Sequence, residues 1–525
     1  MSKAPENSVR RYGINALSSV ATRVLQLTVL VWVNQFLLRR IAPQEYSLYP
    51  LVLSLMLFAE LFRTIFTAGL GRYIVEADSR DDEEGVTRVV SSMFPILVLV
   101  AAFFAVAGSI AAWQLNRILK IEAAYLWEAR AMLLLLVASL CVNVVAAPFA
   151  EGLYARQRFV ALNLIGLGSE ALRILLLLAL LFGVSAKVMW LVVASTIAGA
   201  VSTLLQVVIT RRVLPAIRFR RECFSMETVR TLFDFGLWTT IGGIGGLVSG
   251  TVPALLLNRF GSPLDVTTFH LGRLADFQIR SILVAAGGPA QPALTRIYAT
   301  SGEAAMTDLY YRGGRYHLWL ALLLVAPLII FGREIFELYV GSQYSGSATV
   351  MFAILGVYPL LMASAMFYQV AYAIGKVRAY YICDLAIQIV TLGGLYYAVA
   401  VRGWGAVGAA AAMGLAHGLL HLILIWPMGL LLVSGRWGAF ATRTFVPGVL
   451  PFAAAAASAY GFRALFAMDS WLMLGVGSLA VLGIYLLVLL AFCLDPVDRG
   501  LVVRIVARGR VALGRFRAAA MLKTA

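Results

Sequence analysis

Charged residues are scarce in this sequence of 525 residues. Asp, Glu, Lys and Arg make up 13% of it, about half the share usual in soluble domains, whereas 61% of the residues are apolar. The four cysteines have no paired spacing and the four histidines are scattered, so no disulfide framework and no metal site is expected. The net charge is +17, but a mean hydropathy of +0.87 excludes a soluble nucleic-acid-binding protein. We therefore expect a membrane protein that has no cofactor and does not bind nucleic acid.

Long apolar runs recur along the whole chain. The first, 14–38, follows a short polar and basic segment and is too long for a cleavable signal peptide. The runs are continuous and lack the alternation of barrel strands, which favours helices. The sequence thus predicts an all-α membrane protein with about 14 transmembrane helices, at 14–38, 48–70, 89–113, 130–152, 160–182, 188–210, 234–257, 266–290, 316–332, 348–373, 379–401, 405–433, 444–464 and 471–493.

The connections between the predicted spans are short. The longest are 71–88, 211–233 and 291–315, none of which can hold a soluble domain, so we expect the activity in the membrane or at its surface. If the N-terminus lies in the cytoplasm, 28 of the 43 basic residues fall on cytoplasmic segments, which predicts that both termini are cytoplasmic. The basic tail, 495–525, fits either an amphipathic helix on anionic lipid or a solvated tail.

A faint internal repeat supports two parallel halves. Pro43, Glu45 and Tyr49 follow the first span at the spacing with which Pro263, Asp265 and Phe269 follow the seventh. Parallel repeats are a transporter architecture with the substrate site between the halves. We expect an N-terminal lobe at 1–230, a second lobe at 231–433, two further helices at 434–494 and the cytoplasmic tail at 495–525.

Ionisable residues inside the spans are candidates for function because they are costly to place in a membrane. Pairs at helical spacing can neutralise each other, which we favour for Glu170 with Arg173, whereas Arg23 has no acid within one helical turn. If the lobes face each other, the arginines of the first, second and eighth spans converge on one cavity suited to phosphate. The candidate substrate-binding residues are Arg23, Arg63, Arg273 and Arg280; those for ion coupling or support of the cavity are Glu60, Asp276, Asp384 and His417.

Glycines weaken two of the predicted spans. In the seventh they permit either close helix packing or bending as a gate, and in the eighth a Gly-Gly-Pro sequence predicts a break where a hinge would be useful. The gating candidates are Gly242, Gly243, Gly246, Gly287, Gly288 and Pro289. His417 and His421, four residues apart, are either proton-linked or structural.

Four stretches, in this order along the chain, resemble motifs of a known family. They are Leu38-Arg39-Arg40-Ile41-Ala42-Pro43-Gln44-Glu45-Tyr46-Ser47-Leu48-Tyr49, Gly69-Leu70-Gly71-Arg72-Tyr73, Leu338-Tyr339-Val340-Gly341-Ser342-Gln343-Tyr344 and Gly403-Trp404-Gly405-Ala406-Val407-Gly408-Ala409-Ala410. The sequence resembles the Wzx-type polysaccharide and O-antigen flippases of the multidrug/oligosaccharidyl-lipid/polysaccharide (MOP) exporter superfamily. In the first stretch Ala42 and Ser47 replace glycines of the family.

The resemblance implies two six-helix lobes with two helices alongside, in a bacterial cytoplasmic membrane. It implies that an undecaprenyl-pyrophosphate-linked oligosaccharide is moved to the outer leaflet by alternating access, coupled to H⁺, Na⁺ or the membrane potential. Arg23, Arg63 and Arg273 hold places comparable with the pyrophosphate-binding arginines of lipid II flippases. Partners would be the lipid-linked substrate, membrane lipids and possible polymerase or export machinery.

Three alternatives stay open. A multidrug antiporter of the same superfamily would have twelve spans and an acidic cavity, and a lipid II flippase would share the arginines. A membrane enzyme would need catalytic acids, and the longest outer loop, 114–129, has no pair of acids suited to sugar chemistry, so we expect no enzyme.

Overall fold

The computed structural model is entirely helical where it describes the chain, at residues 32–156, 158–241, 243–287, 290–466 and 468–500. Within these residues, eleven helical segments are long and apolar enough to cross a membrane, and they coincide with the second to sixth and the ninth to fourteenth predicted spans. Most of the first predicted span lies outside the described residues, although 32–38 are helical. The all-helical membrane fold predicted from the sequence is therefore confirmed.

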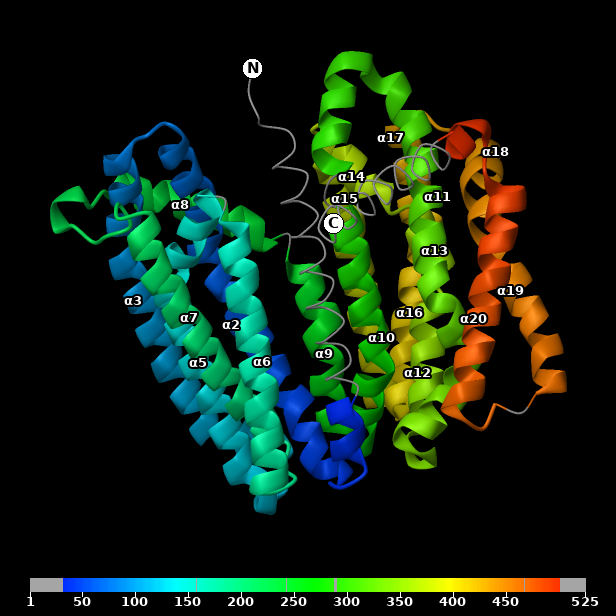
Figure 1. Ribbon diagram of the computed structural model, residues 1–525, viewed down its shortest axis with the longest axis horizontal. Coiled ribbons are helices and arrows are strands. Elements are labelled where there is room, and N and C mark those ends of the chain that lie inside the picture. Colours follow the sequence, from blue (N-terminus) through cyan, green and yellow to red (C-terminus); the bar gives the residue numbers. More distant parts are fainter. Residues whose placement is uncertain (1–31, 157, 242, 288–289, 467, 501–525) are drawn as a thin grey trace, which may run out of the picture. The chain divides into compact units, whose positions relative to one another are not determined.

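The chain divides into two compact units. The first comprises 1–272, 339–350 and 384–413, and the second comprises 273–338, 351–383 and 414–525. In the first unit α3, α5, α6 and α7 lie side by side (Figure 1). Its helices are α2 (Pro43–Ser79), α3 (Glu83–Trp113), α4 (Leu115–Ile118), α5 (Leu126–Ala155), α6 (Phe159–Gly183), α7 (Met189–Val213), α8 (Met226–Ile241) and α9 (Ile244–Phe260).

Five helices contribute residues to both units, and the remainder belong to the second. Those shared are α10 (Pro263–Gly287), α11 (Ala290–Val340), α12 (Gly346–Leu355), α15 (Val377–Tyr396) and α16 (Gly405–Leu420). The second unit alone holds α13 (Tyr358–Ala363), α14 (Met366–Ala373), α17 (Trp426–Leu432), α18 (Trp437–Phe440), α19 (Val446–Leu465) and α20 (Trp471–Val488). In this unit α19 and α20 lie side by side (Figure 1).

The helices distribute apolar side chains between a core and a lipid-facing surface. On α3, Leu97 and Val90 are buried against the neighbouring helices, whereas Leu99, Phe103 and Val106 are exposed. The exposed side chains recur every three or four residues, which is the stripe that one side of a helix presents. A helix can present such a stripe to hydrocarbon, because the backbone groups in its interior are hydrogen-bonded to one another.

One predicted connection is wrong. The segment 291–315 is helical and belongs to α11, a helix of 51 residues. Charged residues lower the hydropathy of this segment without ending the helix, because they carry good helix propensity. The predicted connection 71–88 is likewise largely helical, since α2 continues to Ser79 and α3 begins at Glu83.

The internal repeat has a structural counterpart within the first unit. Glu45, in the first turn of α2, accepts a hydrogen bond of 3.1 Å from the backbone N–H of Val188, where α7 begins. Asp265, in the first turn of α10, accepts one of 2.9 Å from the N–H of Ala406, where α16 begins. Each carboxylate thus satisfies an N–H that a helix start leaves unpaired. Equivalent acids serve equivalent helices in the two halves of the repeat.

The beginnings of α2 and α10 contact each other. The hydroxyl of Thr267 donates to the carbonyl of Pro43 at 3.3 Å, and the ring of His270 lies 6.2 Å from the rings of both Tyr46 and Tyr49. Tyr46 is completely buried and donates to Asn34 at 3.1 Å. The two helices are therefore packed closely at the ends where they begin, all within the first unit.

Candidate functional site

Three charged residues follow one stripe of α10, in the part that belongs to the second unit. Asp276 is almost fully buried and pairs with Arg280 at 2.7 Å (Oδ1 to Nε) and with Arg273 at 3.5 Å (Oδ2 to Nη2). The spacing of three and four residues places all three side chains on one face of the helix. The side chain of Arg273 is 7% exposed and that of Arg280 is 44% exposed. Two guanidinium groups therefore share one buried carboxylate, which leaves a net positive charge inside a predicted span.

Aromatic side chains complete this cluster. Tyr358, at the start of α13, donates its hydroxyl proton to Oδ1 of Asp276 at 2.7 Å. Its ring lies 5.7 Å from the guanidinium of Arg280, and the ring of Phe277 lies 4.6 Å from that of Arg273. Aromatic faces stabilise cations in places that exclude water. The sequence analysis missed Tyr358, because it lies 82 residues from Asp276 and no local motif connects them.

The two histidines of α16 have different surroundings. His417 lies within electrostatic range of Arg280, Asp276 and Arg273, so it joins the charged cluster of α10 in the second unit. The Nδ1 atom of His421 lies 2.8 Å from the carbonyl oxygen of His417, a backbone contact one helical turn away. This contact lies within α16, as the structural alternative for His421 would require, and its role stays a prediction.

Glu60 and Arg63 line a cavity of about 470 Å³ between α2 and α5 in the first unit. Nε of Arg63 donates to Oε2 of Glu60 at 2.8 Å, and Nη1 donates to the hydroxyl of Thr67 at 3.2 Å. Asn143 and Glu151 of α5 line the same cavity. One guanidinium and two carboxylates thus share this space, and sequence reasoning missed the second carboxylate.

A glycine makes room for Glu151. A Cβ atom at Gly71 would lie 2.4 Å from Oε2 of Glu151, well inside the contact distance of the two atoms. The carboxylate therefore occupies the space that a side chain on α2 would fill. The signal available in the sequence was an acid near the end of the fourth predicted span.

Asp384 lies in a third polar group, where α15 packs against α9 within the first unit. Nε2 of Gln388 donates to Oδ1 of Asp384 at 3.4 Å, and the hydroxyl of Ser249 donates to Oε1 of Gln388 at 3.2 Å. A Cβ atom at Gly245 would lie 2.7 Å from Asp384, so this glycine permits close approach of the two helices. Carboxylate, amide and hydroxyl oxygens are ligands that a hard cation accepts.

The glycine-rich seventh span is interrupted. α8 ends at Ile241 and α9 begins at Ile244, with Gly243 at the junction. Gly246 is exposed and has no atom near its missing side chain, whereas a Cβ at Gly236 would lie 1.8 Å from the carbonyl oxygen of Ile65. Close packing therefore explains Gly236 but not Gly246.

Some of the predicted residues are not described. α10 ends at Gly287 as the sequence predicts, but Gly288 and Pro289 lie outside the described residues, as do Arg23 and Gly242. Arg63 belongs to the first unit and Arg273 and Arg280 to the second, so their convergence on one cavity stays a prediction. The described residues contain no group of three acids, histidines or cysteines that could hold a metal ion.

The pair Glu170 and Arg173 on α6 matches the interpretation favoured from the sequence. Nε of Arg173 donates to Oε2 of Glu170 at 3.2 Å, and the two residues also form an ion pair. Because this arginine has a carboxylate of its own, it provides a comparison for Arg273, which shares Asp276 with a second arginine.

Known structures define the class to which this fold belongs. The chain is similar to an inward-facing multidrug resistance MATE transporter of the MOP superfamily (TM-score 0.66, 13% identity, 79% of this chain and 94% of that one). It is equally similar to the lipid II flippase MurJ in an inward closed conformation (TM-score 0.66, 12% identity, 90% and 97%). The chain therefore shares the fold of these two membrane transporters.

Sequence comparisons define the family within this class. Residues 8–298 match the family of polysaccharide biosynthesis proteins. The match covers more than half of the chain, so this protein belongs to that family and is a multi-pass membrane protein of polysaccharide biosynthesis. A relative in Bacillus subtilis (strain 168), the uncharacterized membrane protein EpsK, is 21% identical over 358 residues, which are 65% of this chain and 68% of EpsK.

Proposed function

We propose that this protein flips an undecaprenyl-pyrophosphate-linked oligosaccharide from the cytoplasmic to the outer leaflet of the bacterial cytoplasmic membrane by alternating access. The observation that carries the proposal is the charged stripe of α10, in which Arg273 and Arg280 share the single carboxylate of Asp276. A pyrophosphate offers a second set of acceptor oxygens for these donors. Planar guanidinium groups bind phosphate oxygens in pairs, which suits them to this head group.

Each arginine would exchange a protein carboxylate for the phosphate. Arg280 is the more exposed of the α10 pair and would contact the head group first, while Asp276 and Tyr358 hold Arg273 in place. Arg63 would release Glu60 in the same way, beside a cavity with polar walls. In this proposal Arg23 contributes a further cation, and glycan hydroxyls contact polar groups of the cavity.

The packed beginnings of α2 and α10 support entry from the cytoplasm. In the predicted topology these helices begin at the outer side, where Thr267 bonds to Pro43. Contact at that side favours a state that is closed outside. The lobes would then rock about the bound head group, and the interrupted seventh span with Gly242, Gly243 and Gly246, and the break at Gly287, Gly288 and Pro289, would absorb the bending.

Several groups are candidates for coupling to an ion. Asp384 with Gln388 and Ser249 offers oxygen ligands for Na⁺ or a carboxylate for H⁺. Glu60 and Glu151 would become sites for protons when Arg63 leaves them to bind the phosphate of the substrate. His417 beside Arg280 is the remaining candidate. The membrane potential would also drive an anionic head group outward.

The test is the substitution Arg273→Gln in a strain that depends on this protein for glycan export. We expect export to fall at least tenfold, because the lost guanidinium is replaced by one neutral donor, and the lipid-linked oligosaccharide to accumulate on the cytoplasmic side. Mass spectrometry of extracted lipids identifies that species, and immunoblotting of membranes checks that insertion is unchanged. Wild-type export by Arg273→Gln would refute the proposal.

A matched control and a competing substrate sharpen this test. The double substitution Glu170→Gln with Arg173→Gln removes an ion pair of one acid and one base and leaves the net charge unchanged, and we expect export to continue. Complementation of a strain without its lipid II flippase would instead assign lipid II as the substrate. Resistance to cationic drugs in place of glycan export would assign a multidrug antiporter.

A further inference from the structure

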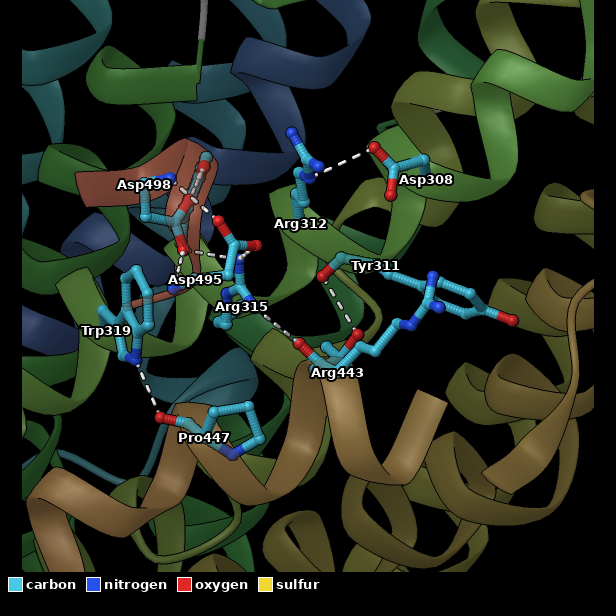
Figure 2. A network of polar contacts seen from close by, with 11 residues as sticks. Asp308, Tyr311, Arg312, Arg315, Trp319, Arg443, Pro447, Asp495 and Asp498 are labelled. Carbon is cyan, nitrogen blue, oxygen red and sulfur yellow. Dashed lines mark hydrogen bonds and ion pairs between the residues drawn. The ribbon is translucent and has the colours of Figure 1, made fainter. Parts of the chain in front are cut away.

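A buried arginine at one end of the second unit holds the chain that follows α20. Arg315 of α11 has a side chain that is 5% exposed, and its Nη2 atom lies 2.7 Å from Asp495 and 2.6 Å from Asp498 (Figure 2). The hydroxyl of Tyr316 also donates to Asp498. A guanidinium that is buried with two carboxylates fixes this part of the chain far better than an exposed ion pair would.

The two carboxylates also start a helix. The backbone N–H of Asp498 donates to Oδ1 of Asp495 at 2.8 Å, and that of Asp495 donates to Oδ2 of Asp498 at 3.3 Å, which is a capping box. Residues 496–500 are helical. Burial disfavours the charged form of Asp495, but the hydrogen bonds from Arg315 and the Asp498 N–H, together with the charges of Arg315 and Arg312, outweigh it and lower the pKa of this carboxyl below its ordinary value. Both carboxylates are thus used inside the protein, and no acid follows them in the sequence.

The same part of α11 holds a second segment through its main chain. Tyr311 accepts a hydrogen bond of 2.8 Å from the N–H of Arg436, and Arg315 donates to the carbonyl of Arg443 at 3.2 Å. Trp319 donates to the carbonyl of Pro447 at 2.8 Å. Figure 2 shows the carbonyl of Arg443 directed at Arg315 while its side chain extends in another direction. These hydrogen bonds fix the backbone at Arg436 and Arg443, whereas the side chains of both arginines are exposed.

Three exposed guanidinium groups result from these contacts. Arg436 and Arg443 are exposed, and Arg499, also exposed, directly follows the buried Asp498. None of the three has an acidic partner in the described part of the chain, whereas the nearby Arg312 pairs with Asp308 at 3.1 Å. Trp437, next to Arg436, is 51% exposed. We call Arg436, Trp437, Arg443 and Arg499 the basic patch.

We propose that the basic patch binds the head groups of anionic phospholipids. Its members lie where predicted spans end, so lipid head groups are adjacent, and tryptophan is the side chain most typical of that depth. Phosphate oxygens match the forked donors of arginine. From Arg499 to Ala525 the sequence has seven Lys and Arg and no Asp or Glu, so the charge of this region increases toward the C-terminus. In the predicted topology the basic patch faces the cytoplasmic leaflet, whose anionic lipids attract basic segments that lie close to the membrane.

The experiment measures lipid binding to the full-length protein by native mass spectrometry in detergent. The probes are phosphatidylglycerol and phosphatidylcholine with identical chains, and inorganic phosphate at matched ionic strength. We expect preferential binding of phosphatidylglycerol by the wild type. Its affinity should fall roughly fivefold for each arginine changed to glutamine and about 100-fold for R436Q/R443Q/R499Q together. The three side chains are exposed, so folding should persist, and the melting temperature checks this.

The control carries the same change of charge elsewhere. R212Q/R220Q/R221Q alters three exposed arginines on another predicted cytoplasmic connection, and we expect it to retain its affinity for phosphatidylglycerol within about twofold. The proposal is overturned if R436Q/R443Q/R499Q binds phosphatidylglycerol like the wild type, or if the control loses as much affinity. If inorganic phosphate displaces bound phosphatidylglycerol as effectively as the free lipid does, the proposal is overturned in favour of a site for free anions.

Discussion

The carboxylate of Asp276 should be the most sensitive single group of the α10 cluster. The substitution Asp276→Asn keeps the shape of the side chain but removes the carboxylate charge that Arg273 and Arg280 share. The two arginines differ in what they lose. Arg280 has the shorter contact, 2.7 Å, but its side chain is 44% exposed, so the protein encloses its charge less completely. Arg273 is 7% exposed, so its charge would remain buried.

The magnitude follows from this difference. Removing one partner of a buried ion pair costs about 3 to 5 kcal/mol, and the weakened bond from Tyr358 adds about 1 kcal/mol. We therefore expect Asp276→Asn to lower the free energy of unfolding by about 4 to 6 kcal/mol in a detergent unfolding titration. A second substitution at Arg273 to Met should recover at least half of this loss, because it removes the buried charge. Arg280→Gln in the same background should recover less than about 1 kcal/mol.

The double-mutant cycle tests whether Asp276 compensates the buried charge of Arg273. If Asp276→Asn unfolds like the wild type, the carboxylate does not compensate buried charge and the reasoning fails. If Arg280→Gln rescues better than Arg273→Met, exposure is not what determines the cost. The single substitution Tyr358→Phe serves as the control, since it removes one hydrogen bond and no charge.

Two further predictions concern the packing of the helices. Gly236→Ala should strongly reduce the yield of folded protein, because its Cβ would lie 1.8 Å from the backbone oxygen of Ile65. Gly246→Ala should be tolerated or slightly stabilising, because no atom lies within 4 Å of the added Cβ. Size-exclusion chromatography compares the two variants, and equal profiles would contradict the expectation. Glu45→Gln should cost about 1 kcal/mol, because the weakened acceptor stabilises the start of α7. Asp265→Asn should cost more, because Asp265 also accepts hydrogen bonds from Ser262 at the start of its own helix; thermal unfolding measures both losses, and an equal or larger loss for Glu45→Gln would contradict the expectation.

The features that could be predicted from the sequence are those that one helix determines alone. The apolar runs indicated the spans, and the three- and four-residue spacing on α10 indicated the shared carboxylate of Asp276. Around Gly243 the sequence indicated only a weakened helix that permits close packing or bending, and the separation of α8 from α9 was found in the structure.

The features that escaped prediction depend on contacts between distant helices. Tyr358 reaches Asp276 only because α13 packs beside α10, and Glu151 shares the cavity of Arg63 only because α5 packs beside α2. Residues 291–315 were expected to be a connection because charge lowers hydropathy, yet they continue α11. Hydropathy therefore indicates which part of a helix lies in lipid, but it does not indicate where the helix itself ends.

The contacts of Glu45 and Asp265 have a consequence for how this fold changes over time. Each carboxylate reaches the other helix through a main-chain N–H, of Val188 and of Ala406, while Asp265 also accepts a hydrogen bond from the Ser262 hydroxyl in its own first turn. Any residue except proline at those two positions supplies the same donor. The partner can therefore mutate freely without breaking the contact, and only the acid has to be retained. If the two halves arose by duplication, both copies could keep this contact while the rest of their sequences diverged. That would explain why the repeat is faint in the sequence and yet clear at these two helix starts.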